Sequence, residues 1–250
     1  MSDLRLAFDE VPELYDRHRP TYPADLYADI FAHSGIKSDS RVLEIGIGTG
    51  QATQPFLDMG CRVVAVELGK NLVQFTRSKF ADYSNLRVVC AAFEDFGETE
   101  SFDLIFSATA FHWIPEAIGY QKVYSLLKPG GIFARFTNQV ERSGDDKPLF
   151  DAVQGLYEKY MPGSKNKASP GSADIAAKYG FVNIFHKVYR GSRTMFANDY
   201  CKLLSTYSDH RALGESSLSA LSREIRDAID THGGKITLND TISLYLARRP

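Results

Sequence analysis

The amino-acid sequence predicts a doubly wound α/β protein built on a mostly parallel sheet. Over the first 137 residues, apolar runs alternate with helical patterns, and five of the runs are typical of buried strands: RVLEIG (41–46), CRVVAVE (61–67), LRVVCAA (86–92), FDLIFSAT (102–109) and GIFARFT (131–137). Strands that are apolar almost throughout indicate a parallel sheet with both faces covered. Right-handed crossovers bring the carboxyl ends of such strands to one edge, where open α/β sheets bind ligands.

The segments between these strands contain helix and turn signals. A glycine turn and a helix reaching Met59 follow the first strand, and a second helix is predicted near Lys70 to Lys79. A third, at about 116–127, ends at LKPGG (127–131), because proline and two glycines favour a turn. Later in the chain the pattern predicts helices at about 150–160, 196–207 and 218–231, and strands at 181–190 and 241–249. Polar loops, ERSGDDKPLF and YMPGSKNKASPGSAD, flank the first of these helices.

The composition is that of a globular protein without an obvious nucleic-acid surface. The 250 residues are 44% hydrophobic and 24% charged, and the formal net charge is −2, so no basic excess attracts a phosphate backbone. No stretch reaches the ~18–20 apolar residues of a membrane span. The three cysteines, Cys61, Cys90 and Cys201, are widely spaced, and we expect buried free thiols in a reducing, cytoplasmic compartment.

The stretch RVLEIGIGTGQAT carries Gly46, Gly48 and Gly50 in a G-x-G-x-G pattern. A dinucleotide fingerprint needs its third glycine one residue later, where Gln51 stands, so pyrophosphate is disfavoured. Glu44 disfavours it further, because a carboxylate near the end of the first strand repels phosphate in a cleft of low dielectric. The same carboxylate suits a ligand with an amino group or a sulfonium, and S-adenosylmethionine has both and no phosphate.

A second acidic residue, Glu67, ends the second predicted strand, seventeen residues past Gly50. A carboxylate at this place can accept hydrogen bonds from both hydroxyls of a ribose. Since NAD and S-adenosylmethionine both contain an adenosine ribose, Glu67 alone does not separate the two cofactors.

The order and spacing of five motifs, VLEIGIGTGQAT, VVAVELGKNLV, FEDF, FDLIFSATAFHWI and LLKPGG, resemble those of class I S-adenosylmethionine-dependent methyltransferases. Two more, YDRHRPTYP (15–23) and LLSTYSDHRAL (203–213), are similar to the small-molecule subgroup that resembles trans-aconitate methyltransferases. The resemblance implies a seven-stranded Rossmann-like sheet whose last strand is antiparallel, with a helical lid insertion between the last two strands. It implies one domain over 1–250, divided into an N-terminal lid segment (1–35), a cofactor-binding core (36–137) and substrate-side helices with the last two strands (138–250).

The resemblance assigns cofactor contacts residue by residue. The methionine end is lined by the first-strand acid and the glycine turn, the ribose is held by Glu67, and the adenine packs on Leu68. In AAFEDF the family's adenine-facing acid comes slightly late, at Glu94 after Phe93, and Ser107 lies beside the transferable methyl group. The implied cofactor residues are Glu44, Gly46, Gly48, Thr49, Gly50, Glu67, Leu68, Phe93, Glu94 and Ser107.

The acceptor side has a smaller set of candidates. His112 is the candidate catalytic residue, either as a base or as a group that polarises the substrate; the alternative is that it only forms a hydrogen bond with the loop backbone. Trp113 is expected to form an apolar wall or a cation–π contact with the sulfonium. In YDRHRPTYP, three residues are candidates for a lid that contacts the methionine carboxylate or an acidic substrate. The alternative is that this segment is simply charged and solvated. Tyr207 is a further lid candidate. The lid set is Tyr15, Arg19, Tyr22 and Tyr207.

The function predicted from these residues is the transfer of a methyl group from S-adenosylmethionine to a small molecule, with S-adenosylhomocysteine as product. A carboxylate is one candidate for the group that accepts the methyl. The alternative left open is a non-catalytic regulatory protein that binds the same cofactor or its product, whereas an NAD-dependent oxidoreductase is disfavoured. His186 and His210 are isolated, and no metal site is expected. We expect no nucleic-acid or membrane partner, and a monomer or homodimer.

Overall fold

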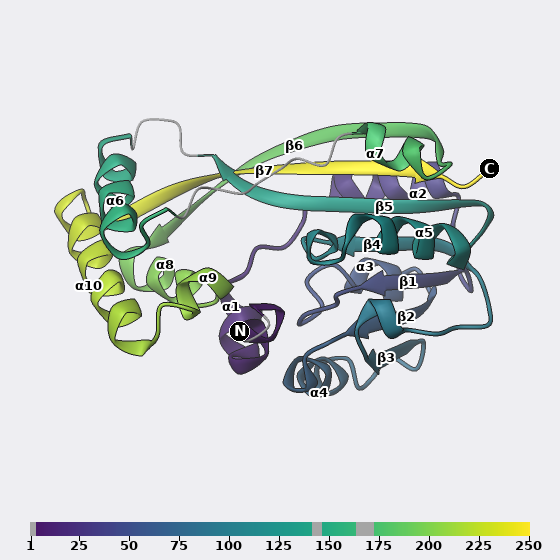
Figure 1. Cartoon of the computed structure of the whole chain (residues 1–250), viewed down its shortest axis with the longest axis horizontal. Helices are drawn as coiled ribbons and strands as arrows, with labels where there is room; N and C mark the ends of the chain where they lie inside the picture. The colour runs from purple at the N-terminus through teal and green to yellow at the C-terminus, as the bar shows by residue number, and fades with distance from the viewer. Residues whose placement is uncertain (1–3, 142–146, 164–172) are drawn as a thin grey trace. The chain divides into compact units, whose positions relative to one another are not determined.

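A computed structural model describes residues 4–141, 147–163 and 173–250. They form a seven-stranded sheet in the order β3-β2-β1-β4-β5-β7-β6 (Figure 1). The strands are β1 Arg41–Ile45, β2 Arg62–Glu67, β3 Leu86–Cys90, β4 Phe102–Ala108, β5 Leu127–Glu141, β6 Val182–Phe196 and β7 Lys235–Arg248. The pairs β1/β2, β1/β4, β2/β3 and β4/β5 are parallel. The doubly wound, mostly parallel sheet confirms the predicted fold class, and the strand order reverses between β1 and β4.

Two compact units divide the chain. The first unit contains Met1–Arg19, Gln139–Ser169 and Arg190–Thr241, and the second contains Pro20–Asn138, Pro170–Tyr189 and Ile242–Pro250. The division into one domain with lid, core and substrate-side segments stays a prediction. Residues 142–146 and 164–172, which fall in the two predicted polar loops, lie outside the described residues.

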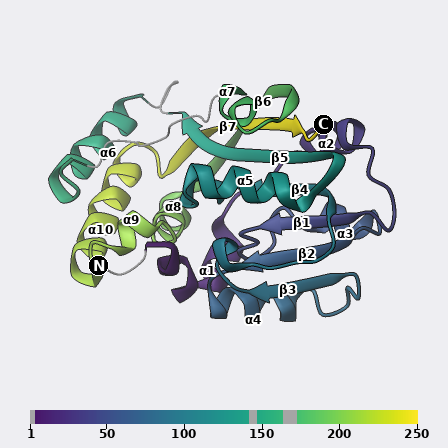
Figure 2. The same ribbon diagram turned by 45° about the vertical axis from the view of Figure 1, so that its right-hand side comes forward.

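Helices of the second unit pack on the sheet through alternate strand residues. Val42 and Leu104 belong to a core shared with α2 (Ala24–Ser34) and α3 (Gln54–Asp58). Leu43 and Ile105 belong to another, shared with α5 (Glu116–Leu126) and α7 (Ala173–Lys178). Because successive strand residues point to opposite faces, the two cores lie on opposite faces of the sheet (Figure 2). The remaining helix, α4 (Lys70–Lys79), packs its apolar side against β2 and β3.

Phe56 of α3 is central to the first of these cores. Its fully buried ring stacks on Phe106 of β4 with 4.3 Å between centroids, and it forms T-shaped pairs with Phe31 and Tyr27, with centroids 5.4 and 5.9 Å apart. Aromatic pairs in these geometries add to the hydrophobic gain from burial. The cluster fixes α3, and with it the turn that leads from β1 into α3.

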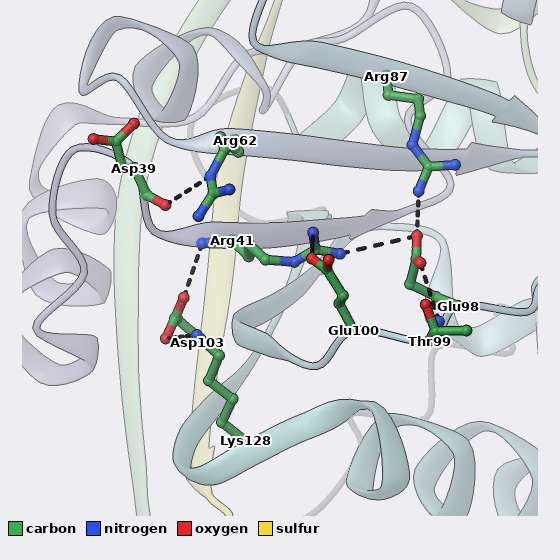
Figure 3. Close-up of polar contacts among 9 residues, drawn as sticks. All are labelled: Asp39, Arg41, Arg62, Arg87, Glu98, Thr99, Glu100, Asp103 and Lys128. Carbon is green, nitrogen blue, oxygen red and sulfur yellow. Dashed lines mark hydrogen bonds and ion pairs between the residues drawn. The ribbon is translucent and has the colours of Figure 1, made fainter.

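Charged side chains gather near the amino ends of the parallel strands, the edge opposite the predicted site (Figure 3). Asp103 of β4 accepts hydrogen bonds from the Arg41 backbone N–H and the Lys128 Nζ, both at 2.8 Å. Arg41 and Arg87 form ion pairs with Glu100 and Glu98, respectively. These contacts join the beginnings of β1, β3, β4 and β5 to one another or to the segment before β4, and they were not predicted from the sequence.

The first unit is mainly helical. It contains the 3₁₀ helix η1 (Leu4–Glu10) and helices α1 (Pro12–His18), α6 (Lys147–Tyr160), α8 (Ala197–Leu204), α9 (Ser208–Arg211) and α10 (Glu215–Thr231). Leucine and isoleucine side chains of α8 and α10 share a core with α6 and the first half of β7. The predicted helical insertion between the last two strands therefore exists as α8, α9 and α10.

Several sequence predictions differ from the structure. LKPGG is part of β5 and not a separate turn: Leu127 pairs with Phe102, the register shifts, and Ile132 then pairs with Leu104. The strands β6 and β7 are longer than predicted. In β7, buried and partly buried residues already alternate from Ile236 onward. The expectation of a buried thiol was wrong for Cys90, which is exposed as the last residue of the edge strand β3.

Replacing Phe56 with Ala should lower the free energy of unfolding by about 3–5 kcal/mol, because a cavity opens among the surrounding rings. Ile118→Ala is the matched control, since this side chain on α5 is 46% exposed and its loss should cost less than ~1 kcal/mol. Urea denaturation of the three proteins measures both values. Equal losses for the two variants would contradict the assigned role of Phe56.

Candidate active site

The glycine turn between β1 and α3 has a backbone that only glycine adopts easily. Gly46, Gly48 and Gly50 have φ values of +74°, +57° and +82°, in the left-handed region. A Cβ atom on Gly46 would lie 2.5 Å from the Cβ of Ala110, which follows β4. The turn after β1 and the loop after β4 are therefore in direct contact, so the structure brings together the predicted cofactor turn and the loop that carries His112.

Glu67, the last residue of β2, connects this turn to the next crossover. One of its carboxylate oxygens accepts a hydrogen bond from the Gly48 N–H and the other accepts one from the Gly69 N–H, each at 3.0 Å. Gly69 is the residue that caps the amino end of α4. The half-buried carboxylate thus holds the backbone of two loops at the carboxyl edge of the sheet.

Glu44 lies in β1 and is 1% exposed. The Thr53 hydroxyl donates a hydrogen bond of 2.7 Å to its carboxyl group. Burial raises the Glu44 pKa to about 8; the Thr53 hydrogen bond opposes this shift, and the charge of Glu67 adds to it. The Glu44 carboxyl is therefore mainly protonated at pH 7 in the protein without its ligand.

Three other predicted cofactor residues differ in exposure. Thr49 is buried inside the turn, where its hydroxyl accepts a 2.6 Å hydrogen bond from the Gln51 side chain. Leu68 follows Glu67 and is half-buried. Ser107 is fully buried in β4 and donates to the Ile45 carbonyl at 2.9 Å, so its hydroxyl joins two strands.

The predicted adenine side is a short 3₁₀ helix, η2 (Phe93–Asp95). Phe93 is buried and Glu94 is half-buried. Lys122 of α5 donates a 2.7 Å hydrogen bond to the Glu94 carbonyl and lies 5.4 Å from the centre of the Phe93 ring. These contacts fix the backbone of η2 from the side of α5.

The loop after β4 contains a strained residue and the candidate catalytic histidine. Thr109 has a φ of +55°, a costly value for a β-branched residue, and its hydroxyl lies 2.8 Å from the Tyr22 hydroxyl. His112 and Trp113 follow in the 3₁₀ helix η3 (Phe111–Trp113), with 5.0 Å between their rings. Nearby protein atoms partly desolvate the exposed His112 imidazole and lower its pKa, which favours the neutral form.

The other lid candidates lie in the first unit. The Arg19 guanidinium stacks over the rings of Tyr207 and Tyr15, at 4.2 and 4.8 Å from their centres. It also donates a 2.8 Å hydrogen bond to the Thr206 carbonyl. The structure therefore brings three predicted lid residues together, with the cation in contact with two aromatic rings.

Three threonines that were not predicted from the sequence bond to the turn or to a predicted site residue: Thr53, Thr76 and Thr109. Thr76 had a usable signal: it lies on the buried side of α4 with Leu72 and Val73. A polar residue on a buried helix face needs a partner, and its hydroxyl donates to the Gly48 carbonyl at 2.7 Å. Thr53 and Thr109 have no comparable spacing signal.

The described part of the chain lacks both a cluster of metal ligands and a membrane-spanning helix. Among those residues, no three His, Cys, Asp or Glu side chains are grouped so that they could hold a metal ion. Within the same ranges, none of the helices has the length and apolar character needed to cross a membrane.

Comparison with known proteins gives the class. Residues 42–131 match a family model described as a methyltransferase domain. An uncharacterized methyltransferase-like protein of Schizosaccharomyces pombe is 24% identical over 221 residues, which cover 87% of this chain and 83% of that protein. Malonyl-[acyl-carrier protein] O-methyltransferase 1 of Ilyobacter polytropus is 31% identical over 116 residues, 44% of this chain and 43% of the relative.

A solved structure shares the fold. Phosphoethanolamine N-methyltransferase 2 of Haemonchus contortus, in complex with phosphomonomethylethanolamine and S-adenosylhomocysteine, matches 100% of this chain and 61% of its own, with 18% identity and a TM-score of 0.57. The chain thus spans less than two thirds of that protein and less than half of the Ilyobacter relative.

Residues 42–131 therefore form a methyltransferase domain, on a fold shared with enzymes that bind S-adenosylmethionine or its product. The protein is a methyltransferase, and its cofactor is S-adenosylmethionine.

The raised pKa of Glu44 makes a testable prediction about stability. Between pH 4.5 and about 8 the folded protein keeps the Glu44 proton and the unfolded chain has lost it, so the free energy of unfolding falls as pH rises through this window. Glu44→Gln should remove this contribution, whose slope has a limit of about 1.4 kcal/mol per pH unit. Urea denaturation of both proteins at pH 5, 6, 7 and 8, without ligand, measures it; parallel curves would refute the assignment.

Proposed function

We propose that this enzyme methylates a small-molecule acceptor through a carboxylate, as a member of the subgroup that resembles trans-aconitate methyltransferases. The observation that carries the proposal is Arg19, whose guanidinium is held by Tyr15, Tyr207 and the Thr206 carbonyl in the first unit. A guanidinium already fixed in position loses little freedom when it binds a carboxylate. Oxygen methylation of a malonyl group, as the name of the Ilyobacter relative states, is chemistry of the same kind.

The cofactor is proposed to bind along the carboxyl edge of the sheet in the second unit. The glycine turn accommodates the methionine end at short range, the Glu67 carboxylate accepts the ribose hydroxyls, and Leu68 packs on the adenine beside Phe93 and Glu94. These residues suit the group, since Gly46 and Gly48 of the left-handed turn carry no side chain and, like Glu67, are only half-buried. A cationic methionine end near Glu44 would favour the ionised carboxylate and lower its pKa.

On the acceptor side, the chain's task is to orient two reactants. When bound, S-adenosylmethionine supplies a methyl group on a sulfonium, which an acceptor oxygen takes in an in-line displacement. Trp113 would limit access of water, and His112, kept neutral by its lowered pKa, would hold or polarise the acceptor. Tyr22 would add a hydroxyl, which Thr109 positions at 2.8 Å. A carboxylate acceptor is already a nucleophile and needs no base, whereas an alcohol or amine would need one.

As part of this proposal, we expect the enzyme to be cytoplasmic, to be a monomer or a homodimer, and to have no nucleic-acid partner.

A direct test offers the enzyme S-adenosylmethionine with a panel of small di- and tricarboxylic acids, each paired with its amide and its alcohol. We expect S-adenosylhomocysteine and a methyl ester with at least one acid and no product from its matched amide or alcohol. His112→Ala should lower turnover at least tenfold, because the imidazole would no longer orient the acceptor, with less than a twofold change in the Kd for S-adenosylhomocysteine. Methylation of amines or alcohols alone would overturn the carboxylate assignment, and unchanged turnover in the variant would make His112 a structural residue.

The assigned role of Glu67 predicts that Glu67→Ala raises the Kd for S-adenosylhomocysteine at least tenfold, a loss typical of charge-assisted hydrogen bonds. Because Glu67 also holds the Gly48 and Gly69 N–H groups, the mutation alone does not isolate the ribose contact. Calorimetric titration with the 2′,3′-dideoxy form of the ligand provides the control. The missing hydroxyls should weaken binding to the wild type and have little effect on the variant; an equal loss in both proteins would remove the ribose assignment.

A further inference from the structure

The second half of α4 and the residue that follows it lie against the glycine turn and contact it through three side chains. Thr76 is fully buried, and its hydroxyl donates a 2.7 Å hydrogen bond to the Gly48 carbonyl. Lys79, at the last helical residue, donates to the Thr49 carbonyl at 2.9 Å. The ring of Phe80 fills the space beside Gly50, since a Cβ atom there would lie only 2.3 Å from the ring.

Gly48 is held by hydrogen bonds on both sides of its α-carbon. The Gly48 N–H donates to the Glu67 carboxylate, and the Gly48 carbonyl accepts from Thr76. Glycine can adopt the φ of +57° observed at this position, but it can also adopt many other backbone conformations. Two hydrogen bonds on the same residue select one of these conformations before any ligand is present.

Selection of the bound conformation in advance reduces the ordering cost of binding. Of the two groups that hold Gly48, Glu67 is half-buried and already assigned to the ribose, whereas Thr76 is buried beneath the turn. Thr76 therefore acts on the ligand only through the shape of the turn.

We infer that Thr76 is a positioning residue for cofactor binding, which holds the Gly48 carbonyl so that the turn has the shape that the methionine end of the cofactor requires. The inference rests on the proposed assignment of the glycine turn to the methionine end. Its consequence is selective: loss of the Thr76 hydroxyl weakens ligands that carry the amino-acid portion and spares ligands that contain the adenosine portion only.

The experiment compares wild type, Thr76→Val and Thr76→Ser by calorimetric titration with S-adenosylhomocysteine and with 5′-methylthioadenosine, which lacks the amino-acid portion. Thr76→Val keeps the side-chain shape and removes the hydroxyl, and Thr76→Ser keeps the hydroxyl. We expect Thr76→Val to raise the Kd for S-adenosylhomocysteine about tenfold and that for 5′-methylthioadenosine less than twofold, and Thr76→Ser to stay within threefold of the wild type for both.

Each other outcome has a definite meaning. Unchanged binding of S-adenosylhomocysteine by Thr76→Val overturns the inference, and so does an equal loss for both ligands, which would indicate general destabilisation of the unit. Weak binding of both ligands by Thr76→Ser overturns it as well, because the hydroxyl would then not be the group that matters. The wild type provides the separate test of the proposed site: if it binds S-adenosylhomocysteine no more tightly than 5′-methylthioadenosine, the turn does not hold the methionine end.

Discussion

The Glu67 carboxylate is the group on which the carboxyl edge of this sheet depends. Its two oxygens accept hydrogen bonds from Gly48 and Gly69, which belong to two successive strand-to-helix connections. Backbone N–H groups in such connections have no partner within a strand or helix, and a carboxylate that accepts two of them forms charge-assisted bonds stronger than neutral ones. One side chain thus sets the position of the turn after β1 relative to the start of α4. The cost is that a carboxylate remains at the edge, where it also shapes the choice of ligand.

Glu44 shows the opposite balance of forces. It is almost completely buried, with the Thr53 hydroxyl as a hydrogen-bond donor, and its pKa of about 8 reflects a burial penalty that this single bond does not offset. A carboxyl group tolerated at such a cost within an apolar strand indicates a function beyond packing. A cationic ligand is the simplest source of the missing stabilisation, because it favours ionisation of Glu44 without repelling Glu67.

The sequence was sufficient for those elements whose signal is local. The first four strands of the sheet and α4 were predicted within two residues, because buried parallel strands read as continuous apolar runs bounded by turns. The first residues of β5 were missed, since Pro129 and the glycines at 130–131 are normally signals that end an element. The first residues of β7 were missed as well, although the glycines at 233–234 mark the point where that strand begins. Their strand conformation comes from pairing with neighbours, as in the contact of Leu127 with Phe102, and pairing is not visible in a local pattern.

The candidate site divides in the same way. Glycines at alternate positions and acids at the ends of two strands can be recognised in the sequence, because the chemistry of a ligand dictates the residue type at each place. Thr76 and Thr109 could not be assigned a partner, since Gly48 is 28 residues from the first and Tyr22 is 87 residues from the second. In Thr109 the fold accepts a left-handed threonine, and the contacts that hold it there are the Tyr22 hydroxyl and the backbone of β5. Thr109 immediately precedes Ala110, whose side chain packs against Gly46, where only a glycine leaves room. We attribute the strain at Thr109 to this close contact. The glycine turn therefore constrains the acceptor loop as strictly as it constrains the cofactor.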